Sequence, residues 1–260
     1  MIQARDTRNN LYLIVNSDYG FTMQPAVIMS AVQYGDTESE INEKIRLVSK
    51  YLTKVLTFRV WNHWQISQSA LEAKSYELCK AIRAMDCKAL KAHLDTDPLQ
   101  APPLEGTPTL NHQNRWRLTV MLSLITEIVA ANSNQPDYPL NHPNIEIEHI
   151  WADHFELHMD EIQGRAEFIT VRNSIGDLLV LPKSFNASYG DGPFESKVQH
   201  YIEHNILAQT LHPNKYFNNP GFIAYVTRTG IPFRSYVTFT RESISERTNL
   251  YRSILMEHWE

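Results

Sequence analysis

Residues 145–150 set the strongest limit on how this chain folds, because their apolar and polar side chains alternate as in a strand with one buried face. Residues 177–181 are a second short apolar run and are predicted to be the partner strand. Residues 182–192 are rich in turn-forming residues, and Pro193 suits the first position of a following helix. The sequence therefore predicts two paired strands, a loop and a helix.

Three polar residues in this region are of the types that phosphodiester hydrolysis needs. A histidine such as His149, whose ordinary pKa is about 6.5, can take the proton of an attacking water. A divalent cation offsets the charge that builds on the phosphate, and it prefers oxygen ligands such as the side chains of Glu148 and Asn186. On residue type, His149 is therefore a candidate general base, and Glu148 and Asn186 are candidate metal ligands.

Four short motifs in this region resemble those of a known family. They are Glu148-His149-Ile150, Gly176-Asp177-Leu178-Leu179-Val180-Leu181, Asn186-Ala187-Ser188 and Pro193-Phe194-Glu195-Ser196-Lys197. In this order they resemble the C-terminal HNH domain of GmrSD-type, modification-dependent restriction endonucleases over residues 145–204. The match is specific as a set, although each motif alone is common.

This resemblance implies an α+β fold, in which a helical N-terminal part precedes a ββα-metal (HNH) nuclease module with a C-terminal helical wrap. It implies a DNA endonuclease or nickase that uses Mg²⁺ (or Mn²⁺) and serves restriction or antiviral defence against modified or foreign DNA. His149 is then the general base, Glu148 and Asn186 hold the metal, and Lys197 contacts DNA phosphate. The family commonly pairs this nuclease with an NTP-hydrolysing sensor domain or subunit. We recognise none in this sequence, so we expect a C-terminal piece of a larger protein or a separate subunit.

Asp177 departs from the family pattern. The resemblance implies an Asn at this position, which braces the loop that carries the catalytic histidine. An ionised Asp can only accept hydrogen bonds. Asp177 therefore either braces the loop through backbone donors, which we favour, or joins the metal ligands.

The same residues allow three other interpretations. Strict strand alternation places Glu148 on the face opposite His149, unless a bulge redirects it. His154 and His158 are four residues apart and would form a zinc site with His149 if they lay on a helix. The third interpretation is a non-catalytic DNA-binding or regulatory module that retains the HNH frame, with Asp177 as the sign of a decayed site.

The chain is predicted to divide at a loop rich in Asn and Pro into a mainly helical region, residues 1–143, and a nuclease-like region, residues 144–260. Prolines within residues 95–109 predict an exposed connector without regular structure. Capping boxes and helical spacing predict further helices that begin at residues 37–40, at Ser69 with Glu72 as box partner, at Arg115, and at residues 243–246.

The net charge of -5 at pH 7 argues against a protein that coats nucleic acid without specificity. DNA contacts would have to come from local basic residues, from the metal or from a partner. Besides Lys197, the weaker candidates for phosphate contacts are Arg172, Lys183 and Arg247.

The spacing of the cysteines and the hydropathy of the chain bear on where in the cell the protein is expected. Cys79 and Cys87 would lie about 12 Å apart on one helix, at roughly 1.5 Å per residue, which is too far for a disulfide. There is no Cys-x-x-Cys pair to hold zinc, and no apolar run approaches the roughly 20 residues that cross a bilayer. We recognise no signal peptide, so a cytoplasmic location is expected.

Overall fold

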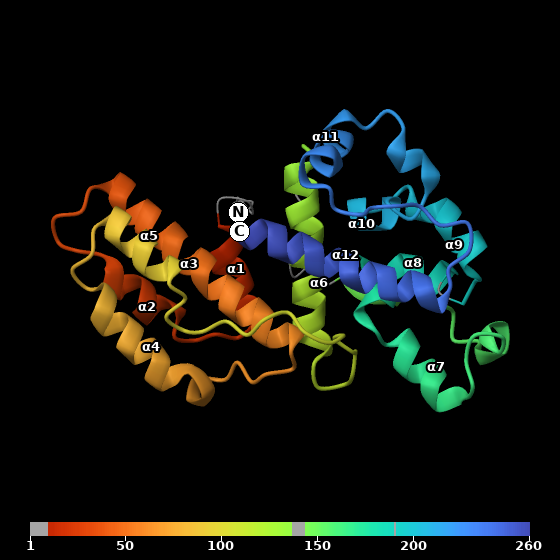
Figure 1. Ribbon diagram of the computed structural model, residues 1–260, viewed down its shortest axis with the longest axis horizontal. Helices are drawn as coiled ribbons and strands as arrows, with labels where there is room; N and C mark the ends of the chain where they lie inside the picture. Colours follow the sequence, from red (N-terminus) through yellow and green to blue (C-terminus); the bar gives the residue numbers. More distant parts are fainter. Residues whose placement is uncertain (1–9, 137–143, 190) are drawn as a thin grey trace. The chain divides into compact units, whose positions relative to one another are not determined.

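The computed structural model describes residues 10–136, 144–189 and 191–260, apart from the side chains of Asn186 and Ala187 (Figure 1). The chain forms two compact units, Met1–Gly106 and Thr107–Glu260. The division between these units lies within the proline-rich connector, and the predicted domain boundary at residues 143/144 stays a prediction. The helix after the connector packs against the strand and helices of the second unit.

The first unit is helical. Its helices are α1 (Leu11–Asp18), α2 (Gln24–Ala31), α3 (Glu38–Trp61), α4 (Gln68–Ile82) and α5 (Cys87–Asp95). The long helix α3 packs on α1, α2 and α5, and α2 also packs on α4 (Figure 1). Val48, Leu52 and Leu56 recur every four residues on the buried face of α3, as the helical spacing predicted.

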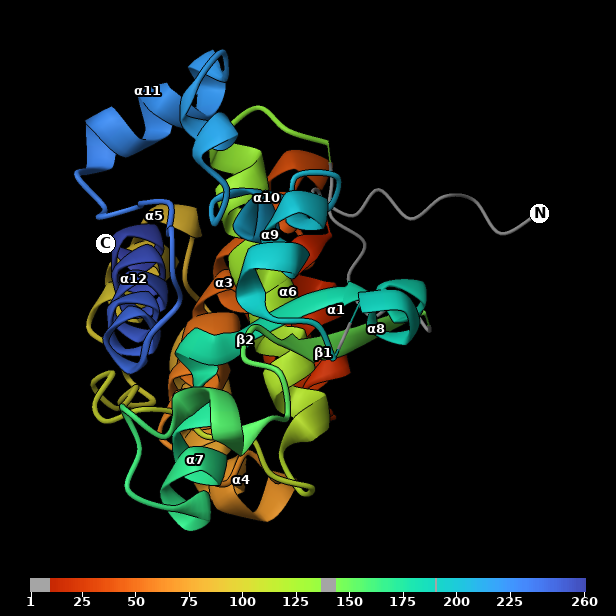
Figure 2. The ribbon, with the colours of Figure 1, turned by 90° about the vertical axis from the view of Figure 1, so that its right-hand side faces the viewer.

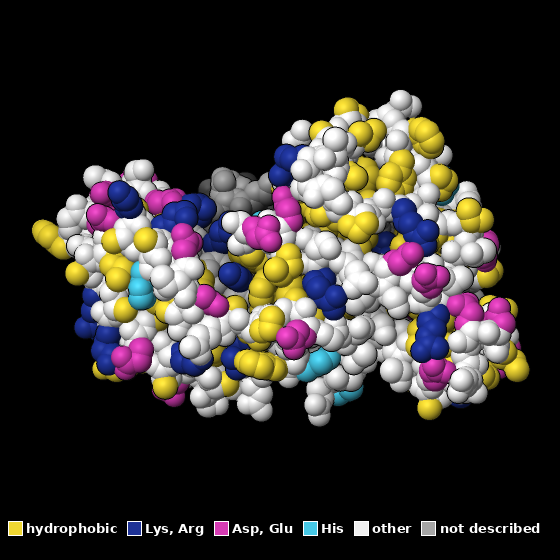
Figure 3. Space-filling model, in the orientation of Figure 1, with side chains coloured by type: hydrophobic (Ala, Val, Ile, Leu, Met, Phe, Trp, Pro, Cys, Tyr) yellow, Lys and Arg dark blue, Asp and Glu magenta, His cyan; other side chains and the backbone are white. Residues whose placement is uncertain are grey.

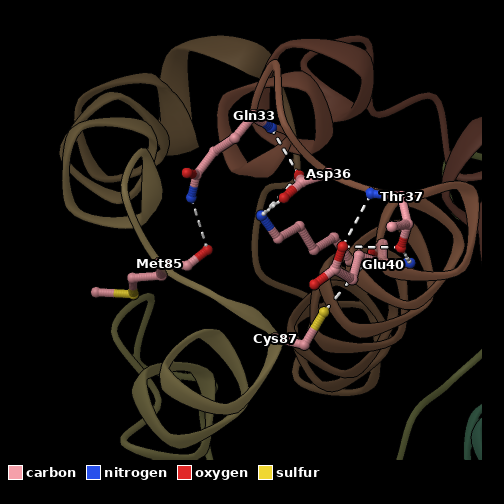
Figure 4. A network of polar contacts seen from close by, with 7 residues as sticks. Gln33, Asp36, Thr37, Glu40, Met85 and Cys87 are labelled. Atoms are coloured by element: carbon pink, nitrogen blue, oxygen red, sulfur yellow. Dashed lines mark hydrogen bonds and ion pairs between the residues drawn. The ribbon is translucent and has the colours of Figure 1, made fainter.

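The predicted capping box at the start of α3 is confirmed (Figure 4). The Glu40 backbone N–H donates to Thr37 Oγ1 at 3.3 Å, and the Thr37 backbone N–H donates to Glu40 Oε2 at 2.8 Å. The box predicted for α4 is wrong, because that helix begins at Gln68, one residue before the predicted start. The hydroxyl of the N-cap residue Ser67 hydrogen-bonds to that of Ser69 at 3.1 Å instead of capping the helix.

The second unit combines helices with two strands. Its elements are α6 (Arg115–Asn132), β1 (Ile145–His149), the 3-10 helix η1 (Phe155–His158), α7 (Arg165–Arg172), η2 (Ile175–Asp177), β2 (Leu178–Pro182), α8 (Lys183–Tyr189), α9 (Phe194–Tyr201), α10 (Ile206–Gln209), η3 (Pro213–Tyr216), α11 (Pro220–Thr229) and α12 (Arg241–Trp259). This confirms the α+β class.

The two strands pair antiparallel, in a register that runs from Ile145 opposite Pro182 to His149 opposite Leu178. The sequence predicted both strands, the second with its start one residue early. It predicted a loop after them, and this is wrong, because residues 183–189 form helix α8. Phe185 is buried in that helix, with its ring 5.4 Å from the ring of Tyr201. Burying this aromatic side chain favours the helix over the turn-forming preferences of its neighbours.

Helix α6 is the core of the second unit, as its apolar circumference predicted. Its side chains from Val120 to Ala130 are all buried, and it packs on β2, α10, α11 and α12. Figure 2 shows both strands beside it. None of the helices in the described ranges combines the length and the apolar character needed to cross a bilayer.

The C-terminal helix α12 packs closely on η2. A Cβ atom on Gly176 would lie 1.9 Å from the carbonyl oxygen of Ile244, so only glycine allows this approach. Helix α12 begins two residues before the predicted box, with a capping box between Thr240 and Ser243. Within the close contact, the Tyr251 hydroxyl donates to the Leu178 carbonyl at 2.9 Å, which ties α12 to the first residue of β2.

Candidate active site

His149 is the last residue of β1, and its ring is held by a residue that follows α7. The His149 Nε2 and Asn173 Oδ1 atoms lie 3.1 Å apart. Because the amide oxygen can only accept, Nε2 carries the hydrogen and Nδ1 carries the lone pair. Burial, reinforced by the positive charge of Arg172, lowers the pKa of His149 to about 3. The imidazole is therefore neutral at neutral pH and can accept a proton at Nδ1.

Glu148 points to a different element, as strand alternation predicted. Its side chain is 4% exposed, and its Oε1 atom accepts hydrogen bonds from Lys197 Nζ at 2.8 Å and from the Tyr201 hydroxyl at 3.2 Å, both on α9. Burial raises the pKa of Glu148, and the charge of Lys197 opposes that shift. Its second oxygen, Oε2, makes no hydrogen bond to any residue that the structure describes.

The structure does not support the predicted phosphate contact of Lys197. Its side chain is fully buried, and its ammonium group donates to Glu148 and, at 2.6 Å, to the backbone carbonyl oxygen of His149. A phosphate of duplex DNA needs an exposed cation, and this one is covered. Lys197 instead ties α9 to the end of β1, beside both candidate catalytic side chains.

Asp177 lies at the end of η2, fully buried. Its Oδ1 atom accepts the Trp151 backbone N–H at 3.0 Å, and its carbonyl oxygen accepts the Ile150 N–H at 2.8 Å. It therefore grips the two residues that follow His149, which is the contact that a brace requires. Its other oxygen, Oδ2, is buried with no hydrogen-bond partner in the described part of the chain, and burial raises the pKa of Asp177 well above its ordinary value.

Asn186 belongs to α8, which packs against β1 and β2, but its side chain lies outside the described residues. The prediction that it holds a metal therefore remains a prediction. The close packing of α8 on the strand that carries Glu148 is compatible with it.

The three-histidine zinc site finds no support. His158 lies in a 3-10 helix, where its ring stacks on Trp151 at a centroid distance of 3.8 Å, and His154 precedes that helix. Among the residues that the structure describes, no three His, Cys, Asp or Glu side chains gather closely enough to hold a metal ion. We therefore assign His158 to the aromatic packing around Trp151.

Two contacts of the site were missed by sequence reasoning. Tyr201 lies four residues after Lys197, on the same helical face, so a spacing argument could have paired them. Asn173 offers no such signal, because it lies 24 residues from His149 in an irregular segment. Only the fold brings Asn173 to the histidine.

A model of the family described as "GmrSD restriction endonucleases, C-terminal domain" matches residues 105–254. This range covers more than half of the chain and nearly all of the second unit, including His149, Asp177 and Lys197. Comparisons with curated proteins and with solved structures gave no match. By the extent of the family match, the chain belongs to the C-terminal domain family of GmrSD restriction endonucleases.

Proposed function

We propose that the second unit is a metal-dependent DNA endonuclease or nickase of the HNH (ββα-metal) type. Membership of a restriction endonuclease family supports nuclease activity in general. The observation that supports the specific proposal best is the state of His149. Asn173 accepts the hydrogen bond from its Nε2–H, and Nδ1 makes no hydrogen bond within the described part of the chain. An imidazole ring that is held in one orientation, with a lone pair left for a water molecule, has the geometry of a general base.

In this proposal, His149 removes a proton from the water that attacks the phosphorus atom. Asn173 acts through it, because the hydrogen bond to Nε2 sets the tautomer and the orientation of the ring. Asp177 holds the backbone just after His149, through the N–H groups of Ile150 and Trp151. The contacts of Asn173 and Asp177 hold the His149 side chain in one position during the reaction.

A divalent cation fits the free oxygen of Glu148. Oε2 is a hard, anionic donor with no hydrogen bond to a described residue, whereas Oε1 is held by Lys197 and Tyr201. We therefore propose that Glu148 and Asn186 hold Mg²⁺ or Mn²⁺. When bound, the ion would offset the negative charge on the phosphate and on the departing 3′ oxygen. Lys197 positions Glu148 for this task.

The test is nicking of supercoiled plasmid DNA with Mg²⁺ or Mn²⁺ by the full chain. His149→Ala should lower the rate by roughly 10²–10⁴-fold, the usual contribution of a general base. His154→Ala is the matched control, because this exposed histidine lies nearby and should leave the rate unchanged. Equal nicking by the wild type and His149→Ala, or none by the wild type with any divalent metal, would refute the nuclease.

A second arm of this test addresses the metal ligand. Glu148→Gln removes the anionic donor and should abolish detectable Mn²⁺ binding in calorimetry as well as nicking. Glu146→Gln is its control, because Glu146 lies on the same strand, about half-exposed, with an ion pair to Lys183 at 3.4 Å. Retained Mn²⁺ binding in Glu148→Gln would place the metal elsewhere.

One observation favours the alternative, a non-catalytic DNA-binding or regulatory module. Glu148 and His149 contact different elements, α9 and the residue after α7, and the Lys197 ammonium beside Glu148 repels a cation. This alternative predicts duplex binding without nicking, and binding that is equal with and without Mg²⁺.

The biological setting extends the proposal. We propose that the substrate is modified or foreign DNA and that an NTP-hydrolysing sensor domain or subunit selects it, since such a partner accompanies the family that the motifs resemble. Two free cysteines, Cys79 and Cys87, suit a reducing cytoplasm. The chain alone should nick modified and unmodified plasmid equally, and a preference for modified plasmid that arises only when a sensor is added would support this division of labour.

A further inference from the structure

Arg172, the last residue of α7, has a guanidinium group that is fixed at one end and open at the other. Its side chain is half-buried, and its Nε atom donates to the Trp151 carbonyl oxygen at 3.1 Å. Its Nη1 and Nη2 groups make no hydrogen bond or ion pair with the residues that the structure describes, and neither is buried without a partner. Four N–H donors on a planar group that is held at Nε therefore have no acceptor among the described residues.

This open end lies next to the candidate base. Arg172 bonds to the residue two positions after His149, and its neighbour Asn173 bonds to His149 itself. The two links run side by side between the end of α7 and the end of β1. Arg172 also lies close enough to His149 to affect its pKa. Burial lowers that pKa most, and the charge of Arg172 is the next largest cause.

Several cationic side chains lie near His149, although the chain as a whole is acidic. The three charged groups that depress the pKa of His149 are Arg172, Arg115 and Lys197. The net charge of the chain is -5. Figure 3 shows acidic and basic side chains interspersed over the face that it displays, with no extended basic field. A phosphate group is therefore attracted to this site by a few local cations and not by a broad surface potential.

We propose that Arg172 is the phosphate-binding residue of the site and holds a DNA phosphate beside His149, in the role that the family resemblance implied for Lys197. This rests on the proposed function for the identity of the phosphate. A guanidinium group matches two phosphate oxygens with parallel N–H donors, and the bond to Trp151 holds it in place before DNA arrives. Lys197 cannot do this, because it is buried and paired with Glu148. Arg115 is exposed at the start of α6 and has no contact that fixes it in the described structure.

The experiment measures DNA binding separately from cleavage. In the full chain carrying His149→Ala, fluorescence anisotropy with a labelled duplex gives the dissociation constant at several salt concentrations. Arg172→Gln should weaken binding about tenfold near 0.1 M salt and reduce the slope of log affinity against log salt by about 1. Arg172→Lys should keep the slope of log affinity against log salt, because it keeps the positive charge. It should recover only part of the affinity, because a lysine lacks the paired N–H donors of the guanidinium group. Arg165→Gln, at the exposed start of the same helix, should stay within twofold.

Two results would overturn the inference. Arg172→Gln could bind within twofold of its parent with an unchanged slope. Alternatively, Arg172→Gln and Arg172→Lys could lose the same affinity and melt at the same lowered temperature, which would assign Arg172 to a structural bond with Trp151. Failure of the proposed function looks different: the wild type nicks no DNA with any metal, while Arg172→Gln still lowers the salt slope.

Discussion

Each unit of this protein contains a buried lysine paired with a carboxylate, and the two pairs differ in how fully the carboxylate is used. In the first unit, Lys44 is 1% exposed and its Nζ atom lies 2.7 Å from Asp36. In the second, Lys197 is fully buried and its Nζ atom lies 2.8 Å from Glu148. Both lysines are buried and paired, so the two pairs differ in how the carboxylate oxygens are hydrogen-bonded.

Asp36 is saturated. Lys44 donates to Oδ1 at 2.9 Å and to Oδ2 at 2.7 Å, and the Gln33 backbone N–H donates to Oδ2 at 2.7 Å. The hydrogen bonds from Lys44 hold the pKa of Asp36 below its usual range. Glu148 receives both of its bonds on Oε1, and burial raises its pKa. A pair that only holds loops together satisfies both oxygens, whereas the pair at the candidate site leaves one oxygen for a ligand.

Removing each lysine should give the largest contrast. Lys197→Met leaves the buried Glu148 carboxylate and the His149 carbonyl without their main donor, which should cost about 3–5 kcal/mol of unfolding free energy. Lys44→Met should cost less, because Asp36 is 11% exposed and keeps its bond from Gln33. Urea unfolding monitored by circular dichroism measures both. Equal losses would contradict the expectation that Glu148 depends more on its lysine than Asp36 does.

The same contrast explains what the sequence could and could not predict. The Thr37–Glu40 box, the strand at residues 145–149 and the apolar helix α6 were predicted because each is encoded by residues a few positions apart. The burial of Lys197 was not, because helical spacing does not reveal which element covers a helix. Asn173 was missed for the same reason, since its bond to His149 exists only because the fold brings the residue after α7 to the end of β1.

Asp177 and Asp36 should respond to pH with opposite signs. Burial raises the pKa of Asp177 in the folded state, so the wild type loses stability as pH rises from about 3.9 towards that higher pKa. Asp177→Asn keeps an acceptor for Trp151 and removes the charge, so its melting temperature should exceed that of the wild type increasingly with pH. The lowered pKa of Asp36 means that its stabilisation is present above about pH 4 and lost in acid.

The measurement is thermal melting from pH 3 to pH 9. Asp36→Asn should be less stable than the wild type near neutral pH and similar to it at the acidic end. If Asp177→Asn is instead destabilised most at high pH, the Asp177 carboxylate is ionised and stabilising. It would then be a better candidate for the metal shell than for the brace.

The smallest expected effect comes from the second hydrogen bond to Glu148. Tyr201→Phe removes the hydroxyl that donates to Oε1 at 3.2 Å and should cost about 0.5–1.5 kcal/mol. Tyr225→Phe is the matched control, because the hydroxyl of Tyr225 is buried without a hydrogen-bond partner among the described residues, so its loss should be neutral or slightly stabilising. Urea unfolding of the two variants gives the comparison. A cost in Tyr201→Phe no larger than in Tyr225→Phe would mean that Lys197 alone holds Glu148 in place, and that the hydroxyl of Tyr201 adds nothing to the site.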